Sequence, residues 1–127
     1  MDKFLLKHLQ DTRRNTGLVQ AMMQHIYTCN GSVSVSELVS KYHISERQLE
    51  RIFSREIGLS PKNFSRIVRF QQVFKLAASA GSLTSLAFEA GYFDQAHFSR
   101  EFKSFTGLSP RQYFSGKYEF AALFIDD

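Results

Sequence analysis

Arg51 and Arg100 occupy matching places in two stretches of the chain that are offset by 49 residues. At the same offset Phe53 matches Phe102, and the tetrapeptide Gly-Leu-Ser-Pro recurs letter for letter at 58–61 and 107–110. A guanidinium can donate a fork of hydrogen bonds to guanine O6 and N7, so a repeated, outward-facing arginine is suited to reading base pairs. The repeat predicts two similar modules in tandem with a shared chemistry.

The repeat extends to positions that match in kind, and it slips by one residue upstream, where Leu38-Val39 pairs with Leu86-Ala87. Each copy has the pattern of a short helix, a tight turn and a longer helix with a basic outer face. This is the layout of a helix-turn-helix, whose second helix enters the major groove of DNA. The matches in kind are Ile44/Phe93, Leu49/Phe98, Lys62/Arg111 and Phe64/Tyr113.

The outward residues of each second helix are the candidates for contact with base edges. Glutamine can bond adenine N6 and N7, and an alanine methyl can touch the methyl group of thymine. With the apolar positions of these helices facing inward, the base-reading candidates are Arg47, Gln48, Glu50 and Arg51 in the first copy, and Gln95, Ala96, His97, Ser99 and Arg100 in the second.

Two of these candidates have alternative interpretations that the sequence leaves open. Glu50 could accept a hydrogen bond from a cytosine amine, or it could pair with Arg47 or Ser54 and orient them. His97 could contact a base or a phosphate, or it could be an incidental surface histidine. A single outward arginine is often part of an ordinary solvated face, and only its repetition favours a reading role.

Phosphate contacts are expected where basic side chains and helix N-termini gather, because free N–H groups and the helix dipole attract anions. Residues 41–75 hold eight Lys/Arg against three acids, whereas residues 76–127 hold four against six. The first copy therefore carries most of the attraction for a polyanion. The candidate phosphate-binding residues are Ser45, Arg55, Lys62, Asn63, Arg66, Lys103 and Arg111.

The elements that position these residues are all helical, and we expect about seven helices. Capping boxes begin at Ser34 and Ser45, a helix with Phe98, Phe102 and Phe105 inward follows Asp94, and a long helix without a breaker follows Pro61. Twenty residues of helix span about 30 Å, close to the ~34–36 Å turn of B-DNA. The expected parts are 1–17, a linker or frayed segment; 18–59, the first helix-turn-helix; 60–80, the connecting helix; 81–115, the second helix-turn-helix; and 116–127, a tail.

The composition argues against several other classes of protein. Hydrophobic residues make up 43% of the 127, and the 13 Phe with no Trp predict a core filled mostly by Phe. No apolar run approaches the roughly 20 residues of a membrane span. Cys29 is the single cysteine, which fits a reducing cytoplasm and is expected to be a small, buried or half-buried side chain late in a helix. The four His are scattered, and we expect no metal site, no cofactor and no enzymatic activity.

The second copy resembles the signature of the AraC/XylS transcription regulators, and the resemblance covers about residues 18–115. The residues that carry it are Leu86-Ala87, Gly91-Tyr92, Asp94 to Arg100, Phe102-Lys103, and Gly107-Leu108-Ser109-Pro110 with Tyr113. The first copy, with Ile44 to Phe53 and Gly58-Leu59-Ser60-Pro61, is similar to the more variable first motif of that family.

The resemblance implies a bacterial regulator that binds double-stranded DNA through two helix-turn-helix subdomains. It also implies activation through contact with RNA polymerase, and an N-terminal effector or dimerisation domain that this chain lacks, either because it is a small stand-alone regulator or because it is a fragment. Two alternatives stay open. One is a protein-interaction module on the same fold, and the other is the DNA-binding part of a repair enzyme, which would need a reactive cysteine.

Overall fold

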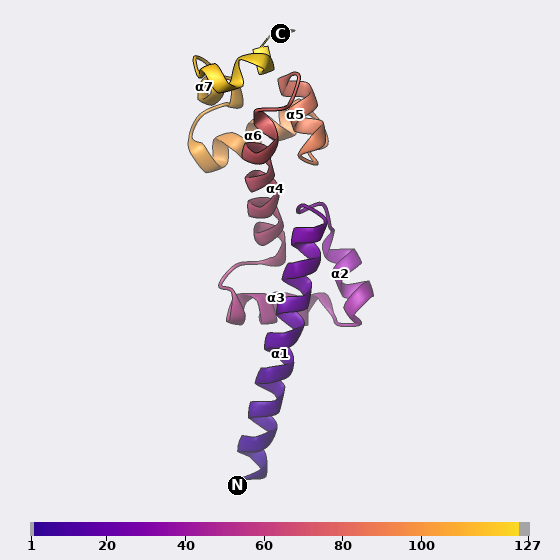
Figure 1. Ribbon diagram of the computed structural model, residues 1–127. Helices are drawn as coiled ribbons and strands as arrows, with labels where there is room; N and C mark the ends of the chain where they lie inside the picture. Colours follow the sequence, from indigo (N-terminus) through magenta and orange to yellow (C-terminus); the bar gives the residue numbers. More distant parts are fainter. Residues whose placement is uncertain (1, 125–127) are drawn as a thin grey trace. The chain divides into compact units, whose positions relative to one another are not determined.

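A computed structural model describes residues 2–124 of the chain, and their only regular secondary structure is helical, with no strand (Figure 1). The all-α fold predicted from the sequence is therefore confirmed. The described residues form seven α-helices and one 3-10 helix: α1 Lys3–Thr28, α2 Val35–Tyr42, α3 Glu46–Glu56, α4 Pro61–Ala77, α5 Leu83–Glu89, α6 Gln95–Thr106, α7 Pro110–Phe114 and η1 Tyr118–Phe124.

The chain divides into two compact units, residues 1–66 and 67–127, and the boundary falls inside α4. Unit 1 contains α1, α2, α3 and the first turns of α4. Unit 2 contains the rest of α4 and every element after it. Each unit thus holds one of the two repeated stretches, and each is described separately below.

The helix ends follow from local capping chemistry that was visible in the sequence. The Ser34 hydroxyl accepts a hydrogen bond from Glu37 N–H at the start of α2, and Ser45 and Gln48 close a full capping box at the start of α3. Ser109 and Gln112 close another at α7. Gly58 and Gly107 end α3 and α6 with positive φ values of 83° and 80°, a conformation that glycine adopts without strain.

The start of α1 differs from the sequence-based prediction. The helix expected to begin at Leu18 begins at Lys3, where the Asp2 carboxylate accepts a hydrogen bond from Phe4 N–H. The prediction of an irregular segment over 1–17 is therefore wrong. Residues 2–10 are exposed, so no buried stripe imposes a periodicity on them. The hydroxyls of Thr12 and Thr16 bond the carbonyls four residues back, which lets these polar residues sit inside a helix.

Two further expectations about the elements need correction. The connecting helix was expected over 60–80, but α4 has 17 residues and ends at Ala77, which corresponds to about 25 Å at 1.5 Å per residue. Phe105 was expected to face inward, but it is 38% exposed and stacks on Phe70 with 4.6 Å between ring centroids. The Ser82 hydroxyl caps α5 by accepting a hydrogen bond from Ser85 N–H.

The core of unit 1 is mostly aliphatic. α1 contributes Val19, Met22 and Ile26, and α2 contributes Leu38. α3 adds Leu49, Ile52 and Phe53. Phe64 at the start of α4 closes the core through edge-to-face contacts with Phe53 and Tyr27. The prediction of a core filled mostly by Phe is therefore wrong for unit 1.

The core of unit 2 is dominated by aromatic rings. Phe98 and Phe102 of α6 and Phe114 of α7 are fully buried. Tyr92 lies beside Phe98, with 5.1 Å between the ring centroids. Residues of η1 belong to this core, since Leu123 is fully buried in it and Phe120 packs on Phe114. The expected tail over 116–127 is thus a packed 3-10 helix as far as residue 124, and 125–127 lie outside the described residues.

None of the helices in the described part of the chain combines the length and the apolar character that a membrane span requires. Cys29 is half-buried just after the last turn of α1, as expected, with its sulfur 3.9 Å from His25 Nε2. No group of three His, Cys, Asp or Glu side chains gathers among residues 2–124 in a way that could hold a metal ion.

Candidate nucleic-acid interface

The outer face of α3 is set by what the helix buries. Leu49, Ile52 and Phe53 point into unit 1, so the opposite side of the helix faces solvent. Each of the four base-reading candidates of this helix is exposed, as are the phosphate candidates at its two ends. The exposed set is Ser45, Arg47, Gln48, Glu50, Arg51 and Arg55.

The three arginines of α3 lie at four-residue steps along this face. In the part of the chain that the structure describes, no carboxylate forms an ion pair with Arg47, Arg51 or Arg55. Glu50, one helical turn from Ser54 and close in sequence to Arg47, pairs with neither. Three unpaired guanidiniums on one face give α3 a strong attraction for anions.

Gln48 has a second task in the protein. Its Oε1 accepts a hydrogen bond from Ser45 N–H at 3.1 Å, while the Ser45 hydroxyl accepts from Gln48 N–H. The capping box thereby fixes the first turn of α3. The amide nitrogen of Gln48 keeps its N–H donors for another partner.

A polar cleft lies between α3 and the N-terminal half of α1, and no pattern in the sequence indicated it. In Figure 1 this half of α1 continues past α3. The cleft has a volume of about 340 Å³. Its lining combines two arginines of α3 with residues that the sequence analysis assigned to a linker: His8, Asp11, Thr12, Arg14, Asn15, Arg51 and Arg55.

The first turn of α6 is held by several side chains at once. The Asp94 carboxylate caps the helix by accepting from His97 N–H at 2.7 Å. The His97 ring reaches back, and its Nδ1 accepts from Phe93 N–H at 3.3 Å. Gln95 Oε1 accepts from the Thr84 hydroxyl of α5 at 3.0 Å. The turn between α5 and α6 is therefore cross-linked by the side chains of two base-reading candidates.

A buried ion pair lies beneath α6. Glu101 is 7% exposed, and its two carboxylate oxygens accept from Arg69 Nε and Nη2, both at 3.2 Å. His97 Nε2 lies 3.7 Å from the same carboxylate. The fork between Arg69 and Glu101 joins α4 to α6 and compensates two charges that would be costly to bury alone.

Tyr92 completes this buried cluster. Its ring lies under the Arg69 guanidinium, with 5.1 Å from Cζ to the ring centroid. Its hydroxyl is buried and makes no hydrogen bond of ordinary geometry with any described residue. Burial, and then the negative charge of Glu101, raise the pKa of the Tyr92 hydroxyl above its usual value, and Arg69 opposes that shift.

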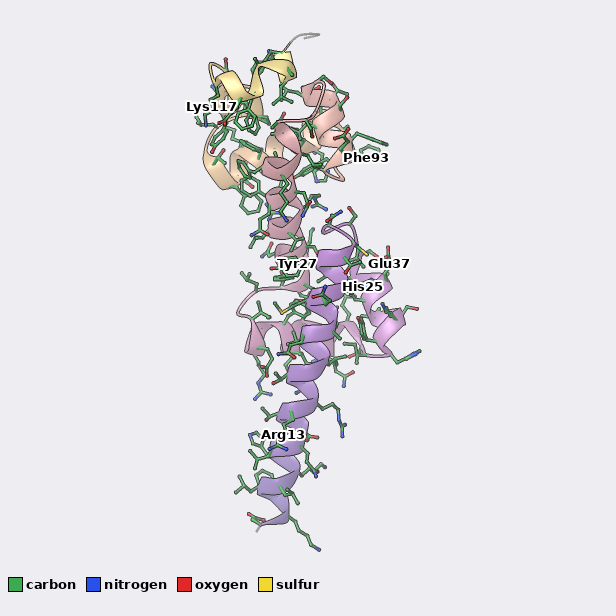
Figure 2. All side chains as sticks on the ribbon, viewed as in Figure 1. Arg13, His25, Tyr27, Glu37, Phe93 and Lys117 are labelled. Carbon is green, nitrogen blue, oxygen red and sulfur yellow. The ribbon has the colours of Figure 1, made fainter. Side chains whose placement is uncertain are left out.

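The outer face of α6 is less basic than that of α3. Arg100 and Lys103 are exposed, and Ala96 presents a methyl group to solvent. Ser99, a base-reading candidate, is only partly exposed. Just before the helix, Phe93 is 91% exposed, and its side chain points away from the ribbon (Figure 2).

The helix N-termini that follow the two Gly-Leu-Ser-Pro repeats carry the remaining phosphate candidates. At α4, Ser60 caps the helix by accepting from Asn63 N–H, and Asn63 Oδ1 accepts from Arg66 Nη1 at 3.2 Å. Lys62 beside them is exposed. At α7, Arg111 is exposed, and its guanidinium lies over the Phe124 ring at 5.6 Å.

The sequence of the chain matches a family of known proteins over most of its length. The family model of a helix-turn-helix domain matches residues 38–116. An HTH-type transcriptional regulator of Haemophilus influenzae is 35% identical over 114 residues, which cover 89% of this chain and 37% of the relative. The HTH-type transcriptional activator RhaS of Escherichia fergusonii is 31% identical over 87 residues, 68% of this chain and 31% of the relative. The matched part of the chain thus spans about a third of the length of these relatives.

The fold of the chain is also similar to solved structures of regulators of this kind. The C-terminal domain of AraT, a response regulator from Geobacillus stearothermophilus, superposes with a TM-score of 0.69 at 25% identity. The match covers 76% of this chain and 82% of that domain. With two capped helix-turn-helix repeats and these matches, the chain belongs to the AraC/XylS family of helix-turn-helix transcription regulators, a family of DNA-binding proteins and not of enzymes.

Proposed function

We propose that this chain reads a specific sequence of double-stranded DNA, with α3 in one major-groove segment and α6 in an adjacent one. The observation that supports this most is the pair Arg51 and Arg100. Each is exposed at the same position of a capped helix whose opposite face is buried. Arginine in that place can bond the edge of a guanine in a fork, and a duplicated module presents it twice.

The reading roles divide according to what each side chain already does within its unit. Arg47, Arg51 and Arg100 carry the main reading roles. Gln48, Gln95 and His97 each form a hydrogen bond within the protein. We infer that these side chains hold the first turn of their helix in place and contact bases with their remaining polar groups. Glu50, Ala96 and Ser99 complete the reading set, with Ala96 toward a thymine methyl group.

The phosphate contacts come from side chains at the edges of these helices and from two helix N-termini. Such contacts set the register of a protein on the duplex without carrying sequence information. Because α6 has fewer basic residues than α3, we infer that unit 1 contributes more of the electrostatic attraction for DNA. The set comprises Ser45, Arg55, Lys62, Asn63, Arg66, Lys103 and Arg111.

We also propose that the chain activates transcription in the bacterial cytoplasm. RhaS, a relative at 31% identity, is named an activator, and this supports the same direction of control. Contact with RNA polymerase would be the physical route. Because the relatives are much longer than this chain, an effector or dimerisation domain on the N-terminal side is part of the proposal.

Selection of bound duplexes from a random pool tests this function most directly. We expect two enriched blocks whose centres lie about 10–10.5 base pairs apart, the spacing of major-groove faces on one side of B-DNA. Affinity for the selected duplex should fall steeply with salt, since several phosphates are neutralised. A pool without enrichment, together with binding that salt does not change, would favour a protein-interaction module on the same fold.

A further inference from the structure

The cleft between α1 and α3 concentrates positive charge that no neighbour neutralises. Arg14 of α1 and Arg51 and Arg55 of α3 line it, with Asp11 as the one acidic residue of the lining. Within residues 2–124, none of these four side chains takes part in an ion pair. The lining thus carries a net charge of about +2, counting His8 as neutral, and holding like charges together is unfavourable until an anion enters.

The size and the other lining groups of the cleft suit a phosphate group. Its volume of about 340 Å³ equals that of roughly ten waters, at ~30 Å³ each. A phosphodiester group can therefore enter with part of its water shell. Asn15 adds amide donors, whereas the Thr12 hydroxyl already donates to the His8 carbonyl at 2.9 Å. Arginine is the side chain that best matches the oxygens of a phosphate.

The position of the cleft points to DNA as the source of that phosphate. Two of its arginines belong to the outer face of α3, which enters the major groove in the proposed function. A helix in the major groove is flanked by the two sugar-phosphate backbones, so a cleft beside it faces one of them. The N-terminal half of α1 then serves as an arm that extends the interface beyond the two helix-turn-helix motifs.

We propose that this cleft holds a backbone phosphate of the bound duplex, clamped between Arg14 of α1 and Arg55 of α3, while Arg51 beside them keeps its fork of hydrogen bonds for a base. The proposal rests on the proposed function. It adds a contact from a segment outside the residues that match the family model, 38–116. Asp11 limits the strength of the site, because its carboxylate repels the phosphate.

The test compares Arg14→Ala with Arg13→Ala in the full chain. Arg13 is the neighbouring residue of α1 (Figure 2), and it does not line the cleft. Both variants remove one positive charge from the same helical turn. Binding of each to the selected duplex and to a random duplex is measured between 50 and 200 mM salt, conditions over which phosphate contacts dominate the change in affinity.

We expect Arg14→Ala to weaken binding to both duplexes equally, by about fivefold to tenfold at low salt, and to lower the slope of log K against log salt by about 1. Arg13→Ala should change affinity less than twofold. Arg14→Lys, which keeps the charge, should retain most of the affinity, and Asp11→Asn should bind more tightly than wild type. Thermal unfolding followed by circular dichroism checks that every variant keeps its fold.

Equal losses for Arg13→Ala and Arg14→Ala would overturn the proposal, because they would show a diffuse charge effect. So would an Arg14→Ala variant that binds like wild type. Neither result touches the proposed function, which stands on the binding of the wild-type chain to the selected duplex and on the loss in Arg100→Ala, a residue that does not line the cleft. Titration with inorganic phosphate at constant ionic strength is a further arm: phosphate binding that Arg14→Ala abolishes, with DNA affinity unchanged in the same variant, would assign the cleft to a free anion instead.

Discussion

At equivalent positions of the two repeats, α3 carries Ile52 and α6 carries Glu101, and both side chains are buried. Around Ile52 the core of unit 1 is aliphatic and has no buried charge among its described residues. Around Glu101, Arg69 and His97 form an ionic cluster beneath the helix. One backbone motif is thus held by hydrophobic burial in one unit and by a buried ion pair with aromatic packing in the other.

The outer faces differ in the opposite sense. The arginines of α3 at 47, 51 and 55 correspond at the repeat offset to Ala96, Arg100 and Ser104 of α6. α3 therefore presents three guanidiniums and α6 one. Conversely, the first turn of α6 is fixed by Thr84, Asp94 and His97, while that of α3 relies on the Ser45–Gln48 box. Duplication of a fold did not duplicate its chemistry: unit 1 has more charge for binding a polyanion, and unit 2 has more side-chain hydrogen bonds at the first turn of its helix.

The largest expected effect comes from the matched core residues Phe53 and Phe102. Replacement of either by Ala should cost about 3–5 kcal/mol of unfolding free energy, as for other buried Phe. Phe102 should lie at the upper end, because its ring packs on five others, whereas Phe53 has one ring contact in the described structure, to Phe64. The neighbours of Phe102 are Phe70, Phe74, Phe98, Tyr113 and Phe114.

Chemical denaturation measures both costs, and Phe88→Ala is the matched control. Phe88 is 81% exposed, so its loss should change the unfolding free energy by less than about 0.5 kcal/mol. A Phe102→Ala variant as stable as the control would show that the repeat is aligned in the wrong phase. A Phe53→Ala cost equal to that of Phe102→Ala would remove the expected difference between the aliphatic and aromatic cores.

The next effect concerns the ion pair of unit 2. Glu101→Leu leaves the Arg69 guanidinium without its bidentate partner, and should cost about 3 kcal/mol, since breaking a buried pair costs roughly 3–5 and Arg69 keeps some exposure. The double variant Arg69→Leu with Glu101→Leu should recover most of that loss. Ile52→Leu, at the equivalent place in unit 1, should cost less than about 1.5 kcal/mol. A double variant no more stable than Glu101→Leu alone would show that the pair is not what Glu101 supports.

Much of this architecture could be predicted from the sequence, because caps and turns are local. Ser34, Ser45 and Asp94 each cap the helix that was expected to follow them. The local pattern was enough because a hydroxyl or carboxylate three residues before a free N–H needs no tertiary partner. The buried stripe of α3 followed from the same short-range periodicity, and the match to the AraC/XylS family confirmed the family resemblance.

Prediction from the sequence failed where the structure depends on solvent exposure or on contacts between residues that are distant in the chain. Residues 3–17 lack an apolar stripe because they have no core to face, and the absence of a pattern was wrongly interpreted as the absence of a helix. Gln95 was expected to be free to bond a base, but its side chain accepts a hydrogen bond from Thr84, which the packing of α5 against α6 brings to it. Glu101 was given no role, yet it is buried in an ion pair with Arg69 of α4, which is distant in sequence. The α1–α3 cleft could not be predicted without the helical extension that forms half of it.

The third prediction tests the outer faces. Arg51→Ala and Arg100→Ala should each weaken binding to the selected duplex by about 1–3 kcal/mol and relax specificity only in the block read by their own unit. Affinity for random duplex should fall more in Arg51→Ala than in Arg100→Ala, because Arg51 also lines the charged cleft. Titration against single-base variants of the site measures both effects. Uniform weakening over all positions would make both residues phosphate contacts rather than readers.

The smallest expected effect isolates the buried hydroxyl of Tyr92, which has no counterpart in the core of unit 1. Tyr92→Phe keeps the ring under Arg69 and beside Phe98 and removes a buried polar atom that has no hydrogen-bond partner among the described residues. The variant should therefore be as stable as wild type, or more stable by up to about 1 kcal/mol at pH 7.

Since the pKa of the Tyr92 hydroxyl is raised in the folded chain, the unfolded chain ionises first as the pH rises through about 10, and wild-type stability is lost there. The advantage of Tyr92→Phe should consequently grow above pH 10. Denaturant titrations at pH 7 and 10.5 measure it, and a variant clearly less stable than wild type at both would show that the hydroxyl supports the ion pair after all.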